Sequence, residues 1–252
     1  MGNEINVTFD STVYTVVLTS GNLALTPITP TPTPPTPPSP VSGMHALAMV
    51  YYGQHNSTVD AQILSAKPAI LIDNTPAGLW KGNCNSATFQ NAGITVFSYI
   101  YYNYDKTSTQ SGMSLNEGLI KAIAAEGTKG VFIDCTNPVA DPDLTTLCAY
   151  AHSLGLLVIV NPGESPADES LYAIADYVMV SEAYTNQVPT STEQGKYEKQ
   201  SIPIGFSAGR TAQQAAQYSN NAWAVGFPFT YSCQNYNQLP SWFTTYITLL
   251  NK

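Results

Sequence analysis

The feature that most constrains this sequence is an alternation of short apolar runs with segments of helical period, clearest in the middle of the chain. Three runs there, at 130–133, 156–160 and 177–180, each end abruptly in polar residues. Apolar runs of this length between helices predict βαβ units and a parallel sheet buried on both faces. Ligands bind such sheets at the carboxyl ends of the strands. Asp134 and Glu182 follow the first and last of these runs, so they are the first candidates for chemistry.

After residue 43 the same alternation continues to the end of the sequence. The predicted strands are 46–51, 69–72, 94–100, 130–133, 156–160, 177–180, 202–206 and 222–227. The predicted helices are 58–66, 86–92, 114–126, 143–154, 167–175, 192–199, 211–219 and 239–250. Ser114 with Glu117 reads as a capping box at the start of the third helix. This count predicts an α/β fold, a (β/α)8 TIM-like barrel. A doubly wound open sheet is the alternative, but no strand is followed by its common phosphate-binding motifs.

Three segments are predicted. Residues 1–26 are rich in Val, Thr and Ile and predict two or three short strands, too few for an independent core. We expect this segment to attach to the main domain, a sister chain or a larger assembly. Residues 27–43 form a Pro/Thr-rich linker, with eight prolines between residues 27 and 40, typical of a polyproline II spacer. Residues 44–252 form the barrel.

The composition excludes some partners. Charged residues are only 10% of the chain and the formal net charge is -8, with no basic patch, so nucleic acid is not expected as a partner. No run of apolar residues is long enough for a membrane-spanning helix, so membrane insertion is not expected either. The N-terminus has no basic region of the kind that begins a signal peptide.

Neither the histidines nor the cysteines suggest a metal, and no cofactor is predicted. The three histidines lie far apart in the sequence, and no CxxC spacing is present. The four cysteines fit either ordinary buried thiols or as many as two disulfides, for which three pairings are possible. The cysteines are Cys84, Cys135, Cys148 and Cys233.

If the barrel forms, its strand-to-helix loops create one mouth lined by aromatic side chains, amides and a few carboxylates. Aromatic rings stack on the C–H faces of sugars while amides and carboxylates bind hydroxyl groups, so this lining favours a carbohydrate. Simple packing of the tyrosines at the rim is the alternative. The predicted sugar-binding residues are Tyr51, Asp73, Asn74, Tyr99, Tyr102, Asn161, Tyr184 and Tyr231.

Asp134 and Glu182 follow the fourth and sixth predicted strands, so their side chains can converge across the mouth. Two carboxylates are the minimum equipment of a glycosidase: one protonates the leaving oxygen, and the other attacks the anomeric carbon or activates water. The sequence does not choose between retention and inversion of configuration. The alternative is that Asp134 begins a turn and Glu182 is a solvated rim residue.

Several motifs together resemble one family. They are GVFIDC at the fourth strand, VIVNPG at the fifth, ADYVMVSE at the sixth and a late LPSWF. This pattern resembles the spherulin-4-like family, related to glycoside hydrolases of the endo-α-1,4-galactosaminidase type. The resemblance covers residue 44 to the C-terminus.

The resemblance implies a (β/α)8 barrel that cleaves galactosamine-containing polysaccharides with acids at the ends of strands four and six. Those positions are Asp134 and Glu182 here, with Tyr99 and Asn161 lining the sugar site. Microbial members often carry two successive acids after strand four, whereas Cys135 occupies the second position in this sequence.

Three functions follow as hypotheses. The first is an extracellular or surface-exposed glycoside hydrolase that acts on an amino-sugar, galactosamine-type polysaccharide through Asp134 and Glu182. The second is a non-catalytic carbohydrate-binding or adhesion module displayed on the Pro-rich stalk. The third is a structural surface or virion protein.

Overall fold

A computed structural model describes residues 4–9, 12–19, 22–28, 46–50, 55–103, 112–183, 188, 195–207, 209–233 and 239–250. The chain divides into two units, Met1–Thr33 and Pro34–Lys252. The division falls inside the predicted linker, most of which lies outside the described residues. The segment boundaries at 26 and 43 therefore stay predictions.

The first unit is an antiparallel sheet of three strands in the order β1-β2-β3. The strands are β1 (Glu4–Phe9), β2 (Thr12–Thr19) and β3 (Asn22–Ile28). Their content of Val, Thr and Ile suits extended backbone. The third strand runs two residues beyond the predicted end of this segment.

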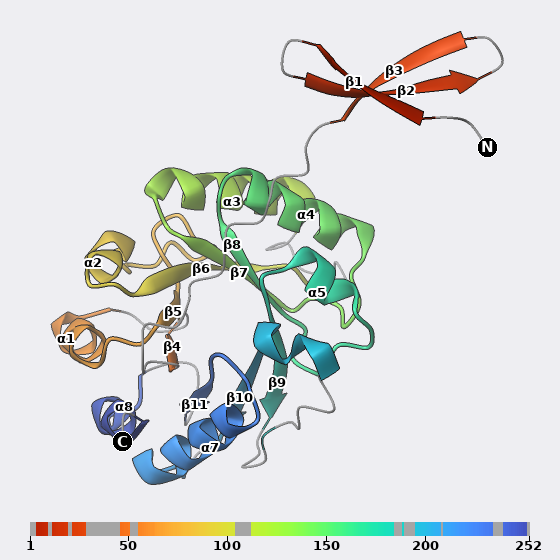
Figure 1. Ribbon diagram of the computed structural model, residues 1–252. Coiled ribbons are helices and arrows are strands. Elements are labelled where there is room, and N and C mark those ends of the chain that lie inside the picture. Colours follow the sequence, from red (N-terminus) through yellow and green to blue (C-terminus); the bar gives the residue numbers. More distant parts are fainter. Residues whose placement is uncertain are drawn as a thin grey trace. The chain divides into compact units, whose positions relative to one another are not determined.

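The second unit is the predicted (β/α)8 barrel, which is confirmed. Its strands are β4 (Leu47–Met49), β5 (Ile70–Asp73), β6 (Thr95–Tyr101), β7 (Gly130–Asp134), β8 (Leu157–Asn161), β9 (Tyr177–Ala183), β10 (Ser201–Phe206) and β11 (Tyr231–Cys233). They pair in sequence order, each parallel to the next. The first and last strands meet through a bridge between Ala46 and Thr230, with Leu47 N–H donating to the Thr230 carbonyl at 3.1 Å. Figure 1 shows the helices around the outside of these strands.

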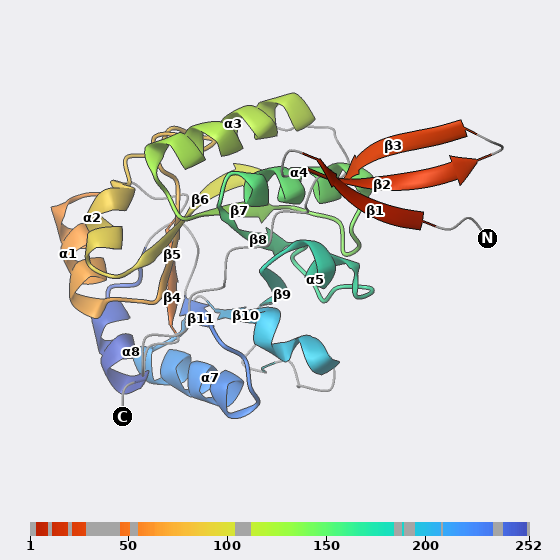
Figure 2. The same ribbon diagram turned by 45° about the horizontal axis from the view of Figure 1, so that its top comes forward.

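Helices follow the strands in turn, as the second view makes clear (Figure 2). They are α1 (Ser57–Ala66), α2 (Ser86–Asn91), α3 (Met113–Glu126), α4 (Pro142–Ser153), α5 (Ser170–Ile174), the 3-10 helix η1 (Gly195–Gln200), α7 (Ala212–Ala224) and α8 (Phe243–Leu250). Side chains of Asn56, Asp141 and Thr211 cap α1, α4 and α7. The predicted capping box at Ser114 is wrong, because α3 begins one residue earlier, after Gly112, with no side-chain cap.

The eighth strand is not where the sequence predicted it. Residues 222–227 were expected to form it, but α7 continues to Ala224 and buries Ala222 on its inner face. The strand is instead the short segment Tyr231–Cys233, which pairs with β10. The closing strand therefore keeps its predicted place between the last two helices but lies further along the chain than predicted.

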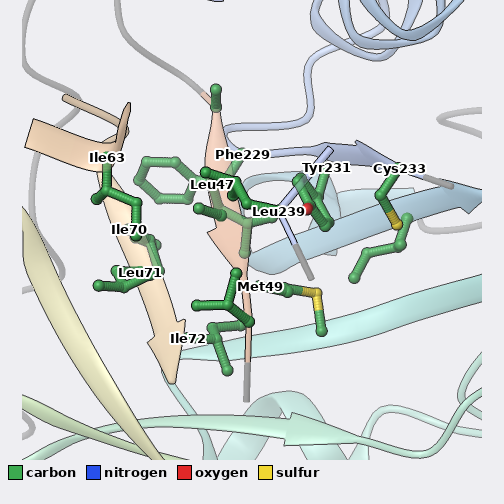
Figure 3. Close-up of a cluster of buried hydrophobic side chains, with 14 of the residues drawn as sticks. Leu47, Met49, Ile63, Ile70, Leu71, Ile72, Phe229, Tyr231, Cys233 and Leu239 are labelled. Carbon is green, nitrogen blue, oxygen red and sulfur yellow. The ribbon is translucent and has the colours of Figure 1, made fainter. Parts of the chain in front are cut away.

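Strand register divides the barrel residues into two cores. Phe132 on β7 points into the barrel, while Val131 and Ile133 pack outward against α3 and α4. The inward-facing core includes Leu47, Met49, Ile70, Ile72 and Tyr231, which Figure 3 shows together with neighbours from the helix side. Gly130 lets this interior close, since a Cβ there would lie 2.4 Å from the ring of Phe97.

None of the four cysteines forms a disulfide; all four lie in the described part of the chain, and three of them are buried. Among the described residues, no helix is both long enough and apolar enough to cross a membrane.

Candidate active site

Asp134 is the last residue of β7 and lies at the carboxyl end of the barrel. It lies two residues after Phe132 and therefore shares the inward face of the strand. Its side chain is buried at 6% exposure and accepts a hydrogen bond from the Tyr99 hydroxyl to Oδ2 at 2.9 Å. Tyr101 on β6 is paired with Asp134 in register. Tyr99, two residues earlier on β6, is therefore the next inward-facing residue below Asp134. The acid is thus held at the base of the mouth rather than on its rim.

One side-chain amide joins the two predicted acids. Asn161 Nδ2, at the end of β8, donates to Asp134 Oδ1 at 2.7 Å and to Glu182 Oε2 at 3.2 Å. Because both oxygens lie close to this single nitrogen, they are at most about 6 Å apart. The two carboxylates therefore converge at one point of the mouth.

The Asn161-Pro162-Gly163 turn fixes the direction of that amide. Gly163 N–H donates to Asn161 Oδ1 at 2.9 Å, which directs Nδ2 toward the two acids. Gly163 has φ +74, in the left-handed region, and a Cβ there would lie 3.6 Å from Glu182 Oε2. Glycine meets this backbone demand at the least cost.

A bulge in β9 turns Glu182 toward the interior. Tyr177 and Met179 face the barrel interior, so strict alternation would point Glu182 outward. The register with β10 skips Val180: Met179 pairs with Ile202, and Ser181 pairs with Pro203. Glu182 consequently pairs with Ile204, an interior residue, and reaches Asn161.

Burial raises the pKa of Asp134 to about 6, and the nearby charge of Glu182 adds to the effect. Hydrogen bonds from Tyr99, Asn161 and the Cys135 backbone oppose the rise. Asp134 can therefore hold a proton near neutral pH. A carboxyl group with this property is suited to donate a proton to a leaving oxygen.

Cys135, at the position where a second acid was expected, has a left-handed backbone with φ 54. Such a conformation is uncommon for a residue with a side chain and marks a constrained turn. It brings the next amide, Thr136 N–H, to the Asn161 carbonyl at 3.0 Å. The turn after β7 is thereby tied to the end of β8.

Trp80 is a site residue that the sequence analysis missed. Its ring stacks on Tyr99 with centroids 4.7 Å apart and planes at 19°, and its side chain is 38% exposed. Tyr99 in turn contacts Asp134, so an exposed aromatic surface lies one residue away from the acid pair. The available signal was a tryptophan between glycines in the loop after β5.

Two predicted sugar-binding residues, Asp73 and Asn74, make their contacts with residues other than this pair. Asp73 pairs in register with Ser98, which faces the opposite side of β6 from Tyr99, so Asp73 points toward the helices. There it contacts His55. Asn74 is buried beside it and packs against Gly78 and Gly82. Asp73, predicted to bind sugar at the mouth, therefore points away from the mouth.

The remaining predicted tyrosines differ in position. Tyr231 has no exposed surface and belongs to the barrel core, because it lies within β11 rather than in the loop expected after residue 227. Tyr102 is buried, and its hydroxyl donates to Asp141 Oδ1 at 2.6 Å at the start of α4. Tyr51 and Tyr184 lie outside the described residues.

Comparison with solved structures finds the same fold in glycoside hydrolases. One is a GH18 chitinase from Flavobacterium johnsoniae, with TM-score 0.54 and 8% identity, covering 82% of this chain and 93% of that one. A fungal endo-β-N-acetylglucosaminidase of glycosyl hydrolase family 18 has TM-score 0.57 and 10% identity, covering 82% and 96%. A chitinase from Bacteroides thetaiotaomicron has TM-score 0.54 and 8% identity, covering 82% and 96%. At these identities the similarity establishes the fold alone.

No protein-family model and no curated protein sequence matches this chain. The resemblance to the spherulin-4-like family therefore stays a prediction.

Proposed function

We propose that this protein is a glycoside hydrolase that cleaves an amino-sugar polysaccharide with Asp134 and Glu182. The observation that carries the proposal is the single Asn161 amide that donates to both carboxylates. Two acids that converge at the mouth of a barrel are the equipment of glycosidic bond cleavage. The surrounding contacts allow the two acids to take different roles.

Asp134 acts as the general acid in this proposal, since its raised pKa keeps the proton available near pH 6. Glu182, less deeply buried, attacks the anomeric carbon as the nucleophile. The bond from C1 to the leaving oxygen breaks as the carboxylate bonds to C1 and the Asp134 proton passes to the oxygen. A water molecule then bonds to C1 as the bond between C1 and Glu182 breaks, and the proton of the water passes to Asp134, which frees the sugar and restores both acids. The acid oxygens, at most about 6 Å apart, favour this retaining route over inversion, for which carboxyls are about 6.5–9.5 Å apart.

The proposed substrate class is a polymer of amino sugars, of galactosamine type. Three observations support it: the exposed ring of Trp80 against Tyr99, the fold shared with chitinases and an endo-β-N-acetylglucosaminidase, and the sequence resemblance. We expect the protein to work outside the cell or on its surface, where such polymers occur.

The test is hydrolysis of a galactosamine-containing polysaccharide, with chitin oligosaccharides in parallel, by the full chain and by Asp134→Asn and Glu182→Gln. Each change should lower kcat at least about 1000-fold while leaving the melting temperature unreduced. Glu164→Gln is the matched control, because Glu164 is an exposed acid in the loop after β8. Unchanged turnover in either acid variant would refute the assignment. Azide rescue with retained or inverted product configuration then separates the two roles.

A second candidate is a carbohydrate-binding module without hydrolysis, favoured by Cys135 in place of a second acid. It predicts saturable binding of the same polysaccharide with no new reducing ends after prolonged incubation. The Trp80→Ala variant should weaken binding under both proposals. Product release by the unaltered chain therefore decides between them.

A further inference from the structure

A second cluster of reactive side chains lies on the outer side of the barrel, between β5, α1 and the loop that leads to α2. Asp73 pairs in register with Ser98, whereas Asp134 pairs with Tyr101 on the same strand β6. Ser98 and Tyr101 are three residues apart and so face opposite sides of the sheet. This cluster is therefore separate from the acid pair at the mouth.

The cluster brings together an imidazole, a carboxyl and a thiol. His55 Nε2 contacts Asp73 Oδ2, and the Cys84 thiol also hydrogen-bonds to Asp73. One ligand atom from each of His55, Asp73 and Cys84 lies within 4.8 Å of the other two. On the other edge of the ring, His55 Nδ1 contacts Asp60 on α1.

The three side chains are enclosed, and the backbone around them is held by other contacts. Cys84 has no exposed surface, and the side chains of His55 and Asp73 are at most 4% exposed. Asn83 and the His55 backbone exchange two hydrogen bonds, each of 2.9 Å, which join the segment before α1 to the loop before α2. Gly82 approaches the Asn74 carbonyl so closely that a Cβ would lie 1.7 Å from it. The loop is thus folded back onto the end of β5, which places Cys84 beside Asp73.

We propose that His55, Asp73 and Cys84 form a binding site for a zinc ion. Thiolate, imidazole and carboxylate are the ligands that Zn²⁺ takes in proteins, at about 2.0–2.3 Å from the metal. In a tetrahedral site such ligands are separated by about 3.5 Å. The ion therefore replaces the direct contact between the His55 ring and the Asp73 carboxylate, and the two side chains move apart to hold it. Water or a further oxygen fills the fourth position.

The charge of the cluster balances with a divalent cation. When zinc binds, the Cys84 Sγ–H proton passes to solvent, and the thiolate and the Asp73 carboxylate supply two negative charges. With neutral His55 the buried assembly has no net charge, which suits an apolar environment between a sheet and helices. A thiolate also favours zinc over magnesium or calcium, which prefer oxygen ligands.

Asp60 supports the proposed site through its contact with the other ring nitrogen of His55. Histidines that bind metals commonly donate their other ring N–H to a carboxylate, which fixes the tautomer and the direction of the ring. His55 is placed in this way, with Nε2 toward Asp73 and Nδ1 toward Asp60. Asp60 is accordingly a positioning residue, and zinc would join β5, α1 and the loop before α2.

The experiment uses the full chain without a histidine tag, loaded with zinc and dialysed, then analysed for metal by mass spectrometry. We expect about one zinc per chain, with the metal lost in Cys84→Ser and Asp73→Asn. Asp60→Asn should retain the site but weaken affinity about 10-fold to 100-fold. The matched control is Cys148→Ser, a buried thiol on α4 outside the cluster, which should bind like the unaltered chain.

Cobalt gives a second readout that does not depend on folding of the variants. Cobalt bound to the unaltered chain should show the intense near-ultraviolet band of a thiolate ligand, and Cys148→Ser should keep it. Chelation should lower the melting temperature of the unaltered chain and leave Cys84→Ser unchanged. A chain that holds no zinc after dialysis, a cobalt complex without the thiolate band, or full zinc content in Cys84→Ser would each overturn the proposal.

Discussion

At Asn161 a single side chain sets the relation between two carboxylates. Its oxygen is occupied by Gly163 N–H, so its two N–H groups face Asp134 and Glu182. An amide can donate to both acids without adding charge, whereas a third carboxylate there would repel both. The turn Asn161-Pro162-Gly163 is therefore best understood as the device that aligns the pair.

Tyr99 provides a test of the role given to Asp134. Its hydroxyl lowers the pKa of the acid by hydrogen bonding, so Tyr99→Phe should raise that pKa. A general acid works while protonated, so activity is lost as pH rises through its pKa. The variant should move the alkaline limb of the kcat/KM profile upward by about one pH unit. The profile, with carboxyl NMR of Asp134, measures the shift; a limb that stays in place or moves to lower pH contradicts the role.

Single residues differ in how well sequence predicts their place. Asp134 and Asn161 could be placed at the mouth because each directly ends an apolar run. The inward direction of Glu182 could not be derived, since it depends on the bulge at Val180, and no local residue pattern marks a bulge there. Trp80 was missed because its contact with Tyr99 joins the loop after β5 to the neighbouring strand β6, a pairing that no sequence spacing shows.

At the scale of elements, β6 and β7 illustrate how packing in the interior restricts substitution. Gly130→Ala would place a Cβ 2.4 Å from the Phe97 ring, which is fully buried. We expect a loss of about 1–3 kcal/mol in the free energy of unfolding, measured by denaturant titration.

The matched control for that change is Gly118→Ala on the exposed side of α3, where a Cβ meets nothing within 4 Å. This change should stabilise the protein by about 1 kcal/mol, because alanine favours helix. Combining Gly130→Ala with Phe97→Leu should recover part of the loss, as the smaller side chain vacates the contact. Equal effects of the two glycine changes would contradict the packing argument.

Elements were predicted well where apolar runs were long and bounded by polar residues, as in β7 and β8. The eighth strand failed for a physical reason: residues 222–227 are as apolar as a strand, yet Ala215, Ser219 and Ala222 are buried at helical spacing on α7. The actual strand has three residues, too few for a period to be visible. Closure of the barrel, not local sequence, selects it.

At the scale of the whole molecule, the organisation into a β-rich N-terminal segment and a following barrel could be predicted from composition and periodicity. What the first segment contacts could not be predicted, because a sheet of three strands carries no sequence mark of a packing surface. The low content of charged residues also leaves few groups to dominate the dependence of stability on pH.

Asp134 should therefore have a measurable effect on how the free energy of unfolding depends on pH. Its pKa is about 6 in the folded chain against 3.8 for an ordinary aspartate, so between those values the folded state binds more protons than the unfolded state. The free energy of unfolding must then fall as pH rises through this window, by an amount on the order of 2–3 kcal/mol from this group. Asp134→Asn removes that loss, so the variant should gain stability relative to the unaltered chain at pH 7 but not at pH 4.

Denaturant titrations of both proteins across this pH range measure the difference. The control is Asp168→Asn, because hydrogen bonds from Ser170 lower the pKa of Asp168, and its ionised form is the favoured one in the folded state. Neutralising it should lose stability at pH 7 relative to acid pH, the opposite sign. A difference between Asp134→Asn and the unaltered chain that stays constant with pH would mean that Asp134 titrates like an exposed carboxyl. In that case the proton needed for leaving-group departure must come from another group.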